Sequence, residues 1–330
     1  MSCDALLIVS FGGPEGMDEV MPFLENVVRG RNIPRERLLG VAHHYEMFGG
    51  VSPINQQNRD LIAALTEELR KNGPALPIYW GNRNWHPMLA ETLRQMASDG
   101  VQNALAFVTS AYNSYSSCRQ YQQNITDAQA EVGPGGKAPR VEKLRAFYNH
   151  PLFIEANIDR VKDALTQLGA PVGQLVYTAH SIPEAMAAKC EYAAQLDEVG
   201  RLIAGELHIE NWKLVYQSRS GSPAQPWLGP DICDHLKQLH HDGVDDVVIA
   251  PIGFVSDHME IVYDLDVEAR QIATELGMNM VRAATAGTHP SFIKMIRELI
   301  LERVDNQPPR FLGSRGPAHA VCPSDSCLPG

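Results

Sequence analysis

Short apolar runs alternate along this chain with longer segments in which hydrophobic residues recur every three or four positions. In the first half the apolar runs cover residues 5–11, 78–81 and 104–112, and residues 58–71 show the helical period. The second half repeats the theme, with apolar runs at 174–180, 213–218, 247–255 and 279–285. Strands that alternate with helices usually pair in parallel through right-handed crossovers. The pattern therefore predicts an α/β fold of two Rossmann-like domains, each a parallel sheet flanked by helices, with an active-site cleft between them.

Length and composition agree with two domains. The chain has 330 residues, and 44% of them are hydrophobic, which is enough to bury a large core. We expect an N-terminal domain at residues 1–171 and a C-terminal domain at 172–310. Prolines and glycines accumulate after position 307, so residues 311–330 are predicted to form an irregular tail.

Charge and glycine spacing exclude several classes of function. The formal net charge of −11 argues against nucleic acids and anionic membranes as partners, because both attract basic surfaces. Gly12, Gly13 and Gly16 lack the spacing of a dinucleotide-binding loop, and residues 133–137 lack the pattern of a phosphate-binding loop. No segment resembles a membrane span or a signal peptide. We therefore expect a soluble cytoplasmic protein whose six cysteines form no disulfide framework.

A row of acidic residues follows the apolar run at 247–255. If the next segment is helical, Glu260, Asp264 and Glu268 share one face. Like charges at this spacing repel one another, so a cation that passes along the row would explain it. The alternative is a capping box, with Asp257 as N-cap and Glu260 at N3, next to an ordinary solvated face.

A histidine ends the apolar run at 174–180. Ser181 and Glu184 then form a second capping-box pattern, with Pro183 in the first turn. Ligands of open parallel sheets bind outside the carboxyl ends of the strands, where both His180 and the acidic row begin. Histidine can take up and release protons near neutral pH, although a histidine at a strand end can also be structural.

Seven short segments, taken in order, carry a resemblance to a known family. They are Phe11-Gly12-Gly13-Pro14, Arg29-Gly30-Arg31, Gly49-Gly50-Val51-Ser52-Pro53, His180-Ser181-Ile182-Pro183, Gln217-Ser218, Pro226-Trp227-Leu228-Gly229-Pro230 and Gly253-Phe254-Val255-Ser256-Asp257-His258-Met259-Glu260. With them the chain resembles the ferrochelatases, lyases that insert ferrous iron into a porphyrin during haem synthesis. The resemblance implies the class II chelatase fold.

The resemblance also assigns roles to the histidine and to the acidic row. His180 and Glu260 would be the catalytic residues, facing each other across the porphyrin plane. Asp264 and Glu268 would continue from Glu260 toward solvent, and all four would contact the metal. Metal insertion needs an acceptor for pyrrole protons and weak ligands that strip water from iron without trapping it. Which residue takes the protons and which first holds the metal stays open.

The porphyrin itself would be held by aromatic and cationic side chains. The resemblance points to Phe11, Arg29, Ser52, Arg83 and Tyr115, and arginine forks suit the propionate carboxylates. Phe11 stands where some bacterial relatives carry a tyrosine that can contact the metal, and ordinary packing is the alternative for this ring.

Some ferrochelatases also hold a [2Fe–2S] cluster through three tail cysteines and one internal cysteine. Cys322 and Cys327 match part of that spacing, Cys118 matches the internal position, and His319 stands where the first tail cysteine would be. The resemblance thus implies a cluster with three cysteines and one histidine. The alternative is that the cluster has been lost and the thiols are reduced.

The opening segment and Arg29-Gly30-Arg31 resemble soluble bacterial enzymes that use coproporphyrin III and form coprohaem. Coproporphyrin III is therefore the expected substrate, with transient contact to other haem-pathway enzymes, and the oligomeric state stays open. The alternatives are a protoporphyrin IX ferrochelatase, a sirohydrochlorin-type chelatase and a non-enzymatic tetrapyrrole or metal carrier. A carrier would not require His180 paired with Glu260.

Overall fold

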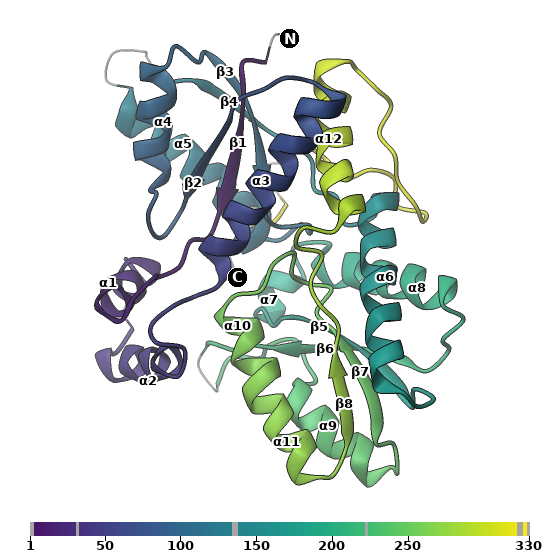
Figure 1. The fold of residues 1–330 in the computed structure, drawn as a ribbon. Helices are drawn as coiled ribbons and strands as arrows, with labels where there is room; N and C mark the ends of the chain where they lie inside the picture. The colour runs from purple at the N-terminus through teal and green to yellow at the C-terminus, as the bar shows by residue number, and fades with distance from the viewer. Residues whose placement is uncertain (1–2, 31–32, 134–137, 222–223, 322–325, 329–330) are drawn as a thin grey trace. The chain divides into compact units, whose positions relative to one another are not determined.

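A computed structural model describes residues 3–30, 33–133, 138–221, 224–321 and 326–328. The chain divides into two compact units, which we describe one at a time. Unit 1 contains residues 1–109, 121–144 and 300–307, and unit 2 contains residues 110–120, 145–299 and 308–330. Each unit has a four-stranded sheet (Figure 1).

The sheet of unit 1 is parallel throughout, with the strand order β2-β1-β3-β4. Its strands are β1 (Ala5–Ser10), β2 (Ile78–Asn82), β3 (Asn103–Val108) and β4 (Arg140–Lys143). β1 is buried along its whole length because it lies between two neighbouring strands and both of its faces are covered. The apolar runs predicted the first three strands. β4 escaped prediction because it is a four-residue edge strand with three charged side chains.

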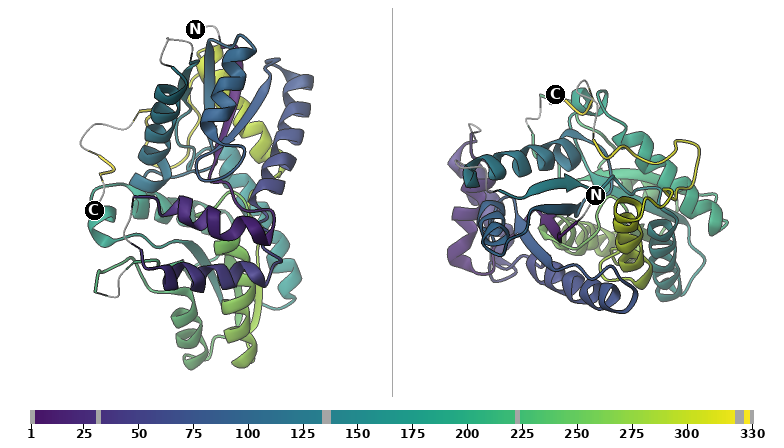
Figure 2. Two further views of the ribbon diagram at one scale, coloured as in Figure 1. Left: turned by 90° about the vertical axis from the view of Figure 1, so that its left-hand side faces the viewer. Right: turned by 90° about the horizontal axis from the view of Figure 1, so that it is seen from above.

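Helices cover both faces of this sheet. α4 (Leu89–Ser98) and α5 (Gln120–Val132) pack against one face and form a core with apolar residues of β1 and β3. α3 (Ile54–Asn72) lies over the opposite face, as Figures 1 and 2 show. Its buried Leu61, Leu65 and Leu69 repeat every four residues, which explains why the helical period was visible in the sequence. α1 (Met17–Val27) and α2 (Arg35–Glu46) pack against each other.

The sheet of unit 2 repeats this topology with the strand order β6-β5-β7-β8, again all parallel. Its strands are β5 (Gln174–His180), β6 (Trp212–Gln217), β7 (Asp246–Ala250) and β8 (Asn279–Arg282). All four were predicted from the sequence, although β7 ends five residues before the apolar run does. In both units the second strand pairs with one side of the first strand, and the third strand pairs with its other side. Sheets wound in this way bind ligands at the carboxyl ends of their strands, near that switch in direction.

The helices of unit 2 also form two layers. α9 (Ile232–His241), α10 (Met259–Val262), the π-helix η2 (Asp264–Ala269) and α11 (Arg270–Glu275) share a core with one face of the sheet. α6 (Pro151–Leu168) packs on β7 and β8, and α8 (Tyr192–Glu206) packs on β6. The predicted boundary at residue 171 would put α6 in the first domain, whereas the contacts put it in unit 2. The remaining elements are the π-helix η1 (Tyr115–Arg119), α7 (Glu184–Ala187) and α12 (Pro290–Val304), whose last residues belong to unit 1.

The tail contains no helix or strand in its described part, residues 308–321 and 326–328, yet it is hydrogen-bonded to unit 2. The Asn149 side chain, which is fully buried, donates to the backbone oxygens of Leu312 (3.2 Å) and Gly316 (2.8 Å). The backbone N–H of Ser314 donates to the buried carboxylate of Glu198 at 3.1 Å. Buried polar side chains therefore fix the course of a segment that has little regular structure of its own.

Candidate active site

Polar residues follow three neighbouring strands of unit 2 at one edge of the sheet. His180 is the last residue of β5, Gln217 is the last residue of β6, and residues 251–258 follow β7. Because β6, β5 and β7 lie side by side and run parallel, their carboxyl ends bring these segments together. This is the edge at which parallel α/β sheets bind their ligands.

His180 and Glu260 form a direct pair at this edge. The Nε2 atom of His180 lies 3.3 Å from Oε1 of Glu260, and the side chains are 29% and 43% exposed. On the other side of the imidazole ring, Nδ1 donates a hydrogen bond to the backbone oxygen of Ser181. Since a carbonyl oxygen can only accept, Nδ1 must carry a proton, and Nε2 is the position whose proton can come and go. The ring is therefore oriented for proton exchange with the partner of Nε2.

Each member of the pair stabilises the charged form of the other. Burial lowers the pKa of His180, but the charge and hydrogen bond of Glu260, with the Ser181 carbonyl, outweigh it and raise this pKa to about 9. Glu260 shifts in the opposite direction. Burial raises its pKa, but the His180 imidazolium outweighs burial and lowers this pKa to about 2. At neutral pH the resting pair is thus an imidazolium next to a carboxylate.

The distance within this pair differs from the expected arrangement. The resemblance implied that His180 and Glu260 face each other across the plane of a porphyrin. A flat ring needs roughly 3.5 Å of contact distance on each of its faces, about twice the separation found here. In this structure the two side chains are instead neighbours, able to act together on one side of a substrate.

The acidic row continues from Glu260 through a widened helical turn. The backbone N–H groups of Val267 (3.1 Å) and Glu268 (3.0 Å) both donate to the backbone oxygen of Tyr263, the second bond spanning the five residues that define a π-helix. The segment is therefore helical, as expected, but not a regular α-helix. π-turns inside helices are rare and often occur at functional sites.

Both capping boxes expected from the sequence are absent. His258, not Asp257, is the N-cap of α10, and its Nδ1 accepts from the backbone N–H of Glu260 at 3.3 Å. Ser181 does not cap α7, because its hydroxyl donates to the backbone oxygen of Leu228 at 2.7 Å. The side chains of Asp257, Glu260 and Ser181 contact residues that are distant in the sequence instead.

Asp264 occupies the centre of the row. Burial raises the pKa of its carboxyl group to about 7, with help from the charges of Glu260 and Glu268, although the Ser218 hydroxyl lowers it by donating to Oδ2. Asp264 therefore feels the charges of both other carboxyl groups of the row. Glu268, at the far end of the row, is exposed, so the row reaches solvent as expected.

Three further residues belong to the site although the sequence analysis gave them no role. Gln217 is buried and donates from its side chain to the backbone oxygen of Glu260. Ser218 has left-handed backbone geometry, with φ of 61°, which turns its hydroxyl toward Asp264. His258 has a ring nitrogen 3.7 Å from Oε2 of Glu260. The Gln217-Ser218 dipeptide was visible as a shared segment, but only the fold reveals what it touches.

The residues expected to bind porphyrin fall in both units. In unit 1, Phe11 follows β1 and Arg83 follows β2, and the Arg83 guanidinium lies 5.5 Å from the centre of the Phe11 ring. Ser52 is buried and Arg29 is exposed. Tyr115 begins η1 in unit 2. The structure thus brings Phe11 and Arg83 together, while Arg31 lies outside the described residues.

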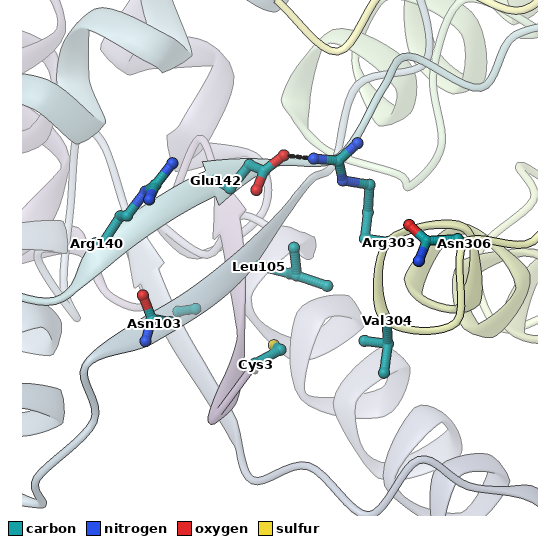
Figure 3. A pocket seen from close by; sticks show the side chains of 9 residues that line it. Cys3, Asn103, Leu105, Arg140, Glu142, Arg303, Val304 and Asn306 are labelled. Atoms are coloured by element: carbon teal, nitrogen blue, oxygen red, sulfur yellow. Dashed lines mark hydrogen bonds and ion pairs between the residues drawn. The ribbon is translucent and has the colours of Figure 1, made fainter. Parts of the chain in front are cut away.

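A cavity of about 130 Å³ in unit 1 lies at the opposite, amino-terminal end of its strands (Figure 3). Asn103 begins β3, Arg140 begins β4 and Cys3 precedes β1. Near its mouth Arg303 and Glu142 form an ion pair. Because ligands of parallel sheets bind at the carboxyl ends, this cavity is not the candidate reaction site.

The expected cluster ligands lie in unit 2, apart from Cys322, which is outside the described residues. Cys118 is in η1, and both Cys118 and Cys327 are 3% exposed. His319 is exposed. Within the described part of the chain, no group of three or more acidic, histidine or cysteine side chains is arranged to hold a metal ion.

Comparison with known proteins identifies the family. The model of the ferrochelatase family matches residues 3–304. The chain belongs to the ferrochelatase family. It is 56% identical over 330 residues to a ferrochelatase of Rhodopirellula baltica, an alignment that covers 98% of this chain and 93% of that protein. A coproporphyrin III ferrochelatase of Streptomyces coelicolor is 49% identical, with coverage of 98% and 93%. Another from Nocardia farcinica is also 49% identical, with coverage of 100% and 97%.

Solved structures support the fold at much lower identity. The sirohydrochlorin chelatase SirB of Bacillus subtilis subspecies spizizenii aligns with a TM-score of 0.56 and 10% identity, over 92% of this chain and 97% of that one. CbiX, a terminal enzyme of sirohaem synthesis, aligns with a TM-score of 0.54 and 13% identity, over 91% and 99%. The two parallel sheets flanked by helices are therefore the class II chelatase fold. Among the described helices, none has the length and apolarity needed to cross a membrane.

Proposed function

We propose that this protein is a ferrochelatase that inserts ferrous iron into coproporphyrin III to give coprohaem. The observation that carries the proposal is the His180–Glu260 pair, 3.3 Å apart, at the start of an acidic row that ends in solvent. A site that only stored a tetrapyrrole would need neither a proton acceptor nor a path for a cation. The identity of 49% to two coproporphyrin III ferrochelatases supports this choice of porphyrin.

The reaction exchanges one cation for two protons. Ferrous iron replaces the hydrogens of two pyrrole nitrogens, and both protons must leave the ring. In the proposed site Glu268 and Asp264 receive iron from solvent and pass it to Glu260 and His180. Carboxylate oxygens and one imidazole bind ferrous iron weakly enough for the metal to exchange, whereas a set of thiolates would retain it. Because the resting pair already holds one proton on His180, it can accept pyrrole protons only by sharing or releasing that proton.

The porphyrin would be held by the other residues that the sequence analysis selected. Arg29 and Arg83 would pair with propionates, Ser52 would donate a hydrogen bond, and Phe11 and Tyr115 would contact the ring. The 5.5 Å approach of Arg83 to the Phe11 ring supports a joint role for these two residues. Coproporphyrin III carries four propionates, so it offers more partners to arginines than protoporphyrin IX, which carries two.

The tail residues are proposed to hold a [2Fe–2S] cluster through Cys118, His319, Cys322 and Cys327. Two observations fit this assignment. Cys118 and Cys327 are both buried, and the Arg119 guanidinium donates to the backbone oxygen of Ser326 at 2.6 Å, which fixes the end of the tail beside η1. A bound cluster would tie the tail to this helix through iron–sulfur bonds. Visible absorption, with iron and acid-labile sulfide content, tests the assignment: Cys118→Ser should remove the cluster and Cys3→Ser should retain it.

The same proposal implies a cellular compartment and a recipient of the product. We place it in the cytoplasm, where the porphyrin precursor and ferrous iron are both accessible, with transient transfer of coprohaem to the next enzyme of haem synthesis. Retention of coprohaem after turnover, followed by release on adding an acceptor protein of that pathway, would support such a transfer.

The deciding experiment is anaerobic metallation by the purified protein. Ferrous iron is offered with coproporphyrin III, protoporphyrin IX or sirohydrochlorin, and the loss of the metal-free absorption spectrum is followed. Preferred turnover of coproporphyrin III is the expected result. Preference for either other ring would reassign the substrate, and tight binding of a porphyrin without metallation would make the protein a carrier.

A further inference from the structure

Arg282, the last residue of β8, joins two acidic residues that are not members of the row, one before Glu260 and one between Asp264 and Glu268. Its guanidinium makes a two-pronged contact with Asp266, from Nε to Oδ1 at 2.7 Å and from Nη2 to Oδ2 at 2.8 Å. It also reaches Asp257, with Nη1–Oδ1 and Nη2–Oδ2 distances of 3.4 and 3.3 Å. The Arg282 side chain is only 14% exposed, so these contacts are shielded from solvent. Paired forks of this kind fix direction as well as distance.

The two partners of Arg282 lie at different points of the segment that carries the row. Asp257 precedes α10, three residues before Glu260, and Asp266 lies inside η2, between Asp264 and Glu268. Thr285 adds a further hydrogen bond, from its hydroxyl to Oδ1 of Asp257 at 3.1 Å. One arginine on the sheet therefore holds the segment that carries the proposed iron ligands at two points, before Glu260 and within η2.

A π-helical turn needs such external support. Its hydrogen bonds span five residues and are less favourable than those of an α-helix, so π-turns persist where tertiary contacts stabilise them. In an α-helix each residue is rotated by about 100° from the one before, and in the wider π-turn by less. If the turn closed to an α-helix, Glu268 would rotate relative to Asp264, so the two carboxylates would stay on one face of the helix but the angle between them would change. Asp266 is on this turn, where the Arg282 fork holds it against β8.

Pairing with Arg282 also removes two carboxylates from competition for the cation. Asp257 and Asp266 are close in sequence to the proposed iron ligands and would otherwise offer oxygens beside the row. Their charges are instead matched by a fixed guanidinium, so iron entering the row meets Glu268, Asp264 and Glu260 as its available ligands.

We propose that Arg282 is a positioning residue for iron delivery: it keeps η2 in its π-helical form and thereby sets the angle at which Asp264 and Glu268 follow Glu260. This inference rests on the proposed ferrochelatase function. Arg282 touches neither the iron nor the porphyrin in this scheme. Its loss should therefore change how the enzyme handles iron and leave the porphyrin side of the reaction intact.

The test compares Arg282→Lys, which keeps the charge and loses the fork, with Arg270→Lys as the matched control. Arg270 begins α11 and donates to the backbone oxygen of Met280 in β8 at 2.6 Å, without an acidic partner among the residues that the structure describes. Iron and coproporphyrin III are varied separately in the anaerobic assay. For Arg282→Lys we expect KM for iron to rise roughly tenfold or more, the effect of losing a charge-assisted hydrogen-bond pair, with kcat and KM for the porphyrin nearly unchanged. Arg270→Lys should leave all three constants near their original values.

A second variant and a second readout separate this role from simple destabilisation. Asp266→Asn removes the same fork from the other side and should reproduce the iron-specific rise. Equal KM values for iron in Arg282→Lys and in the unchanged protein would overturn the inference, as would parallel losses in iron and porphyrin handling. If the protein metallates no porphyrin, the proposed function fails, and Zn²⁺ titration calorimetry still tests the positioning role. Zn²⁺ should then bind at least several-fold more weakly to Arg282→Lys, and equal affinity would refute the role.

Discussion

The Tyr192 hydroxyl donates a hydrogen bond to the backbone oxygen of His180 at 3.1 Å. Tyr192 is in the first turn of α8, so this bond ties the end of β5 to the helix that packs beside it. Burial raises the pKa of Tyr192 far above its ordinary value, so the hydroxyl stays a donor at every working pH. The proposed catalytic histidine is thus fixed through its backbone as well as through its ring.

Tyr192→Phe should weaken this support. Loss of one buried hydrogen bond is expected to lower the free energy of unfolding by about 1 kcal/mol, and metallation should slow because His180 is held less firmly. Urea denaturation and the metallation assay measure the two effects. Tyr177→Phe is the matched control, since the Tyr177 hydroxyl is buried with no hydrogen-bond partner among the described residues. It should be neutral or slightly stabilising, and equal losses in both variants would contradict the role given to Tyr192.

His180→Ala should abolish metallation while coproporphyrin III still binds. The imidazole supplies the exchangeable proton site at Nε2, and alanine cannot replace it. Porphyrin fluorescence quenching measures binding, and the loss of the metal-free spectrum measures turnover. Near-normal turnover by this variant would remove His180 from the catalytic pair.

Asp264→Asn and Glu268→Gln should impair iron delivery more than the chemical step. Each replaces an ionisable carboxyl group of the row with a neutral amide, so KM for iron should rise several-fold while kcat falls less. Glu275→Gln offers a control, because Glu275 ends α11 and accepts a hydrogen bond from Gln271 at the surface. An unchanged iron dependence in both row variants would mean that the acidic row is an ordinary solvated face.

The sequence predicted most of the fold because its signals are local. The buried strand Ala5–Ser10 consists almost entirely of apolar residues, and α3 repeats leucine every four positions. β4 and the placement of α6 were missed for a physical reason. An edge strand of four mostly charged residues has no apolar signature, and a helix does not reveal in its own sequence which sheet it covers.

The candidate site was predictable as a set of residues but not as a geometry. His180 and Glu260 could be selected because each follows an apolar strand, whereas their 3.3 Å separation depends on how β5 and β7 pair. The same limit explains Asp257, whose spacing to Glu260 suggested a cap. Its actual partner, Arg282, lies 25 residues away in the sequence on another strand. A short-range sequence pattern cannot reveal a partner that is so distant in the sequence.

His150 should make the protein sensitive to acid. It is fully buried and caps α6, its Nδ1 accepting from the Leu152 N–H at 3.2 Å. Burial, with the charges of Arg145 and Arg310, lowers its pKa to about 3 and outweighs the Glu298 carboxylate, which lies 3.4 Å from Nε2 and also pairs with Arg310. Below pH 6.5, His150 is therefore protonated in the unfolded chain but stays neutral in the folded chain. This group alone should cost up to about 1.4 kcal/mol of stability per pH unit down to about pH 3.

His150→Ser tests whether His150 lowers stability in acid, because serine can still cap the helix but does not titrate. Between pH 7 and pH 4 the unchanged protein should lose about 3 kcal/mol more stability than the variant, apart from any constant difference in packing. Denaturation curves at several pH values measure the slopes. The exposed His241→Ser should retain the original slope. Identical slopes in His150→Ser and the unchanged protein would mean that His150 is protonated in the fold.

Gly313 decides whether the tail can lie against unit 2. Its φ is 78°, and a Cβ atom at this position would come within 2.4 Å of the Glu198 carboxylate oxygen that accepts from Ser314. Gly313→Ala therefore combines backbone strain with a clash against a buried carboxylate, and should detach residues 310–316. Gly316→Ala is the matched control, because φ there is 73° and a Cβ atom would meet nothing within 4 Å. Both substitutions incur left-handed strain of roughly 1–2 kcal/mol, but only the first meets the carboxylate. Limited proteolysis should cut the tail of Gly313→Ala much faster than that of Gly316→Ala, and equal cleavage rates would show that Glu198 does not hold the tail.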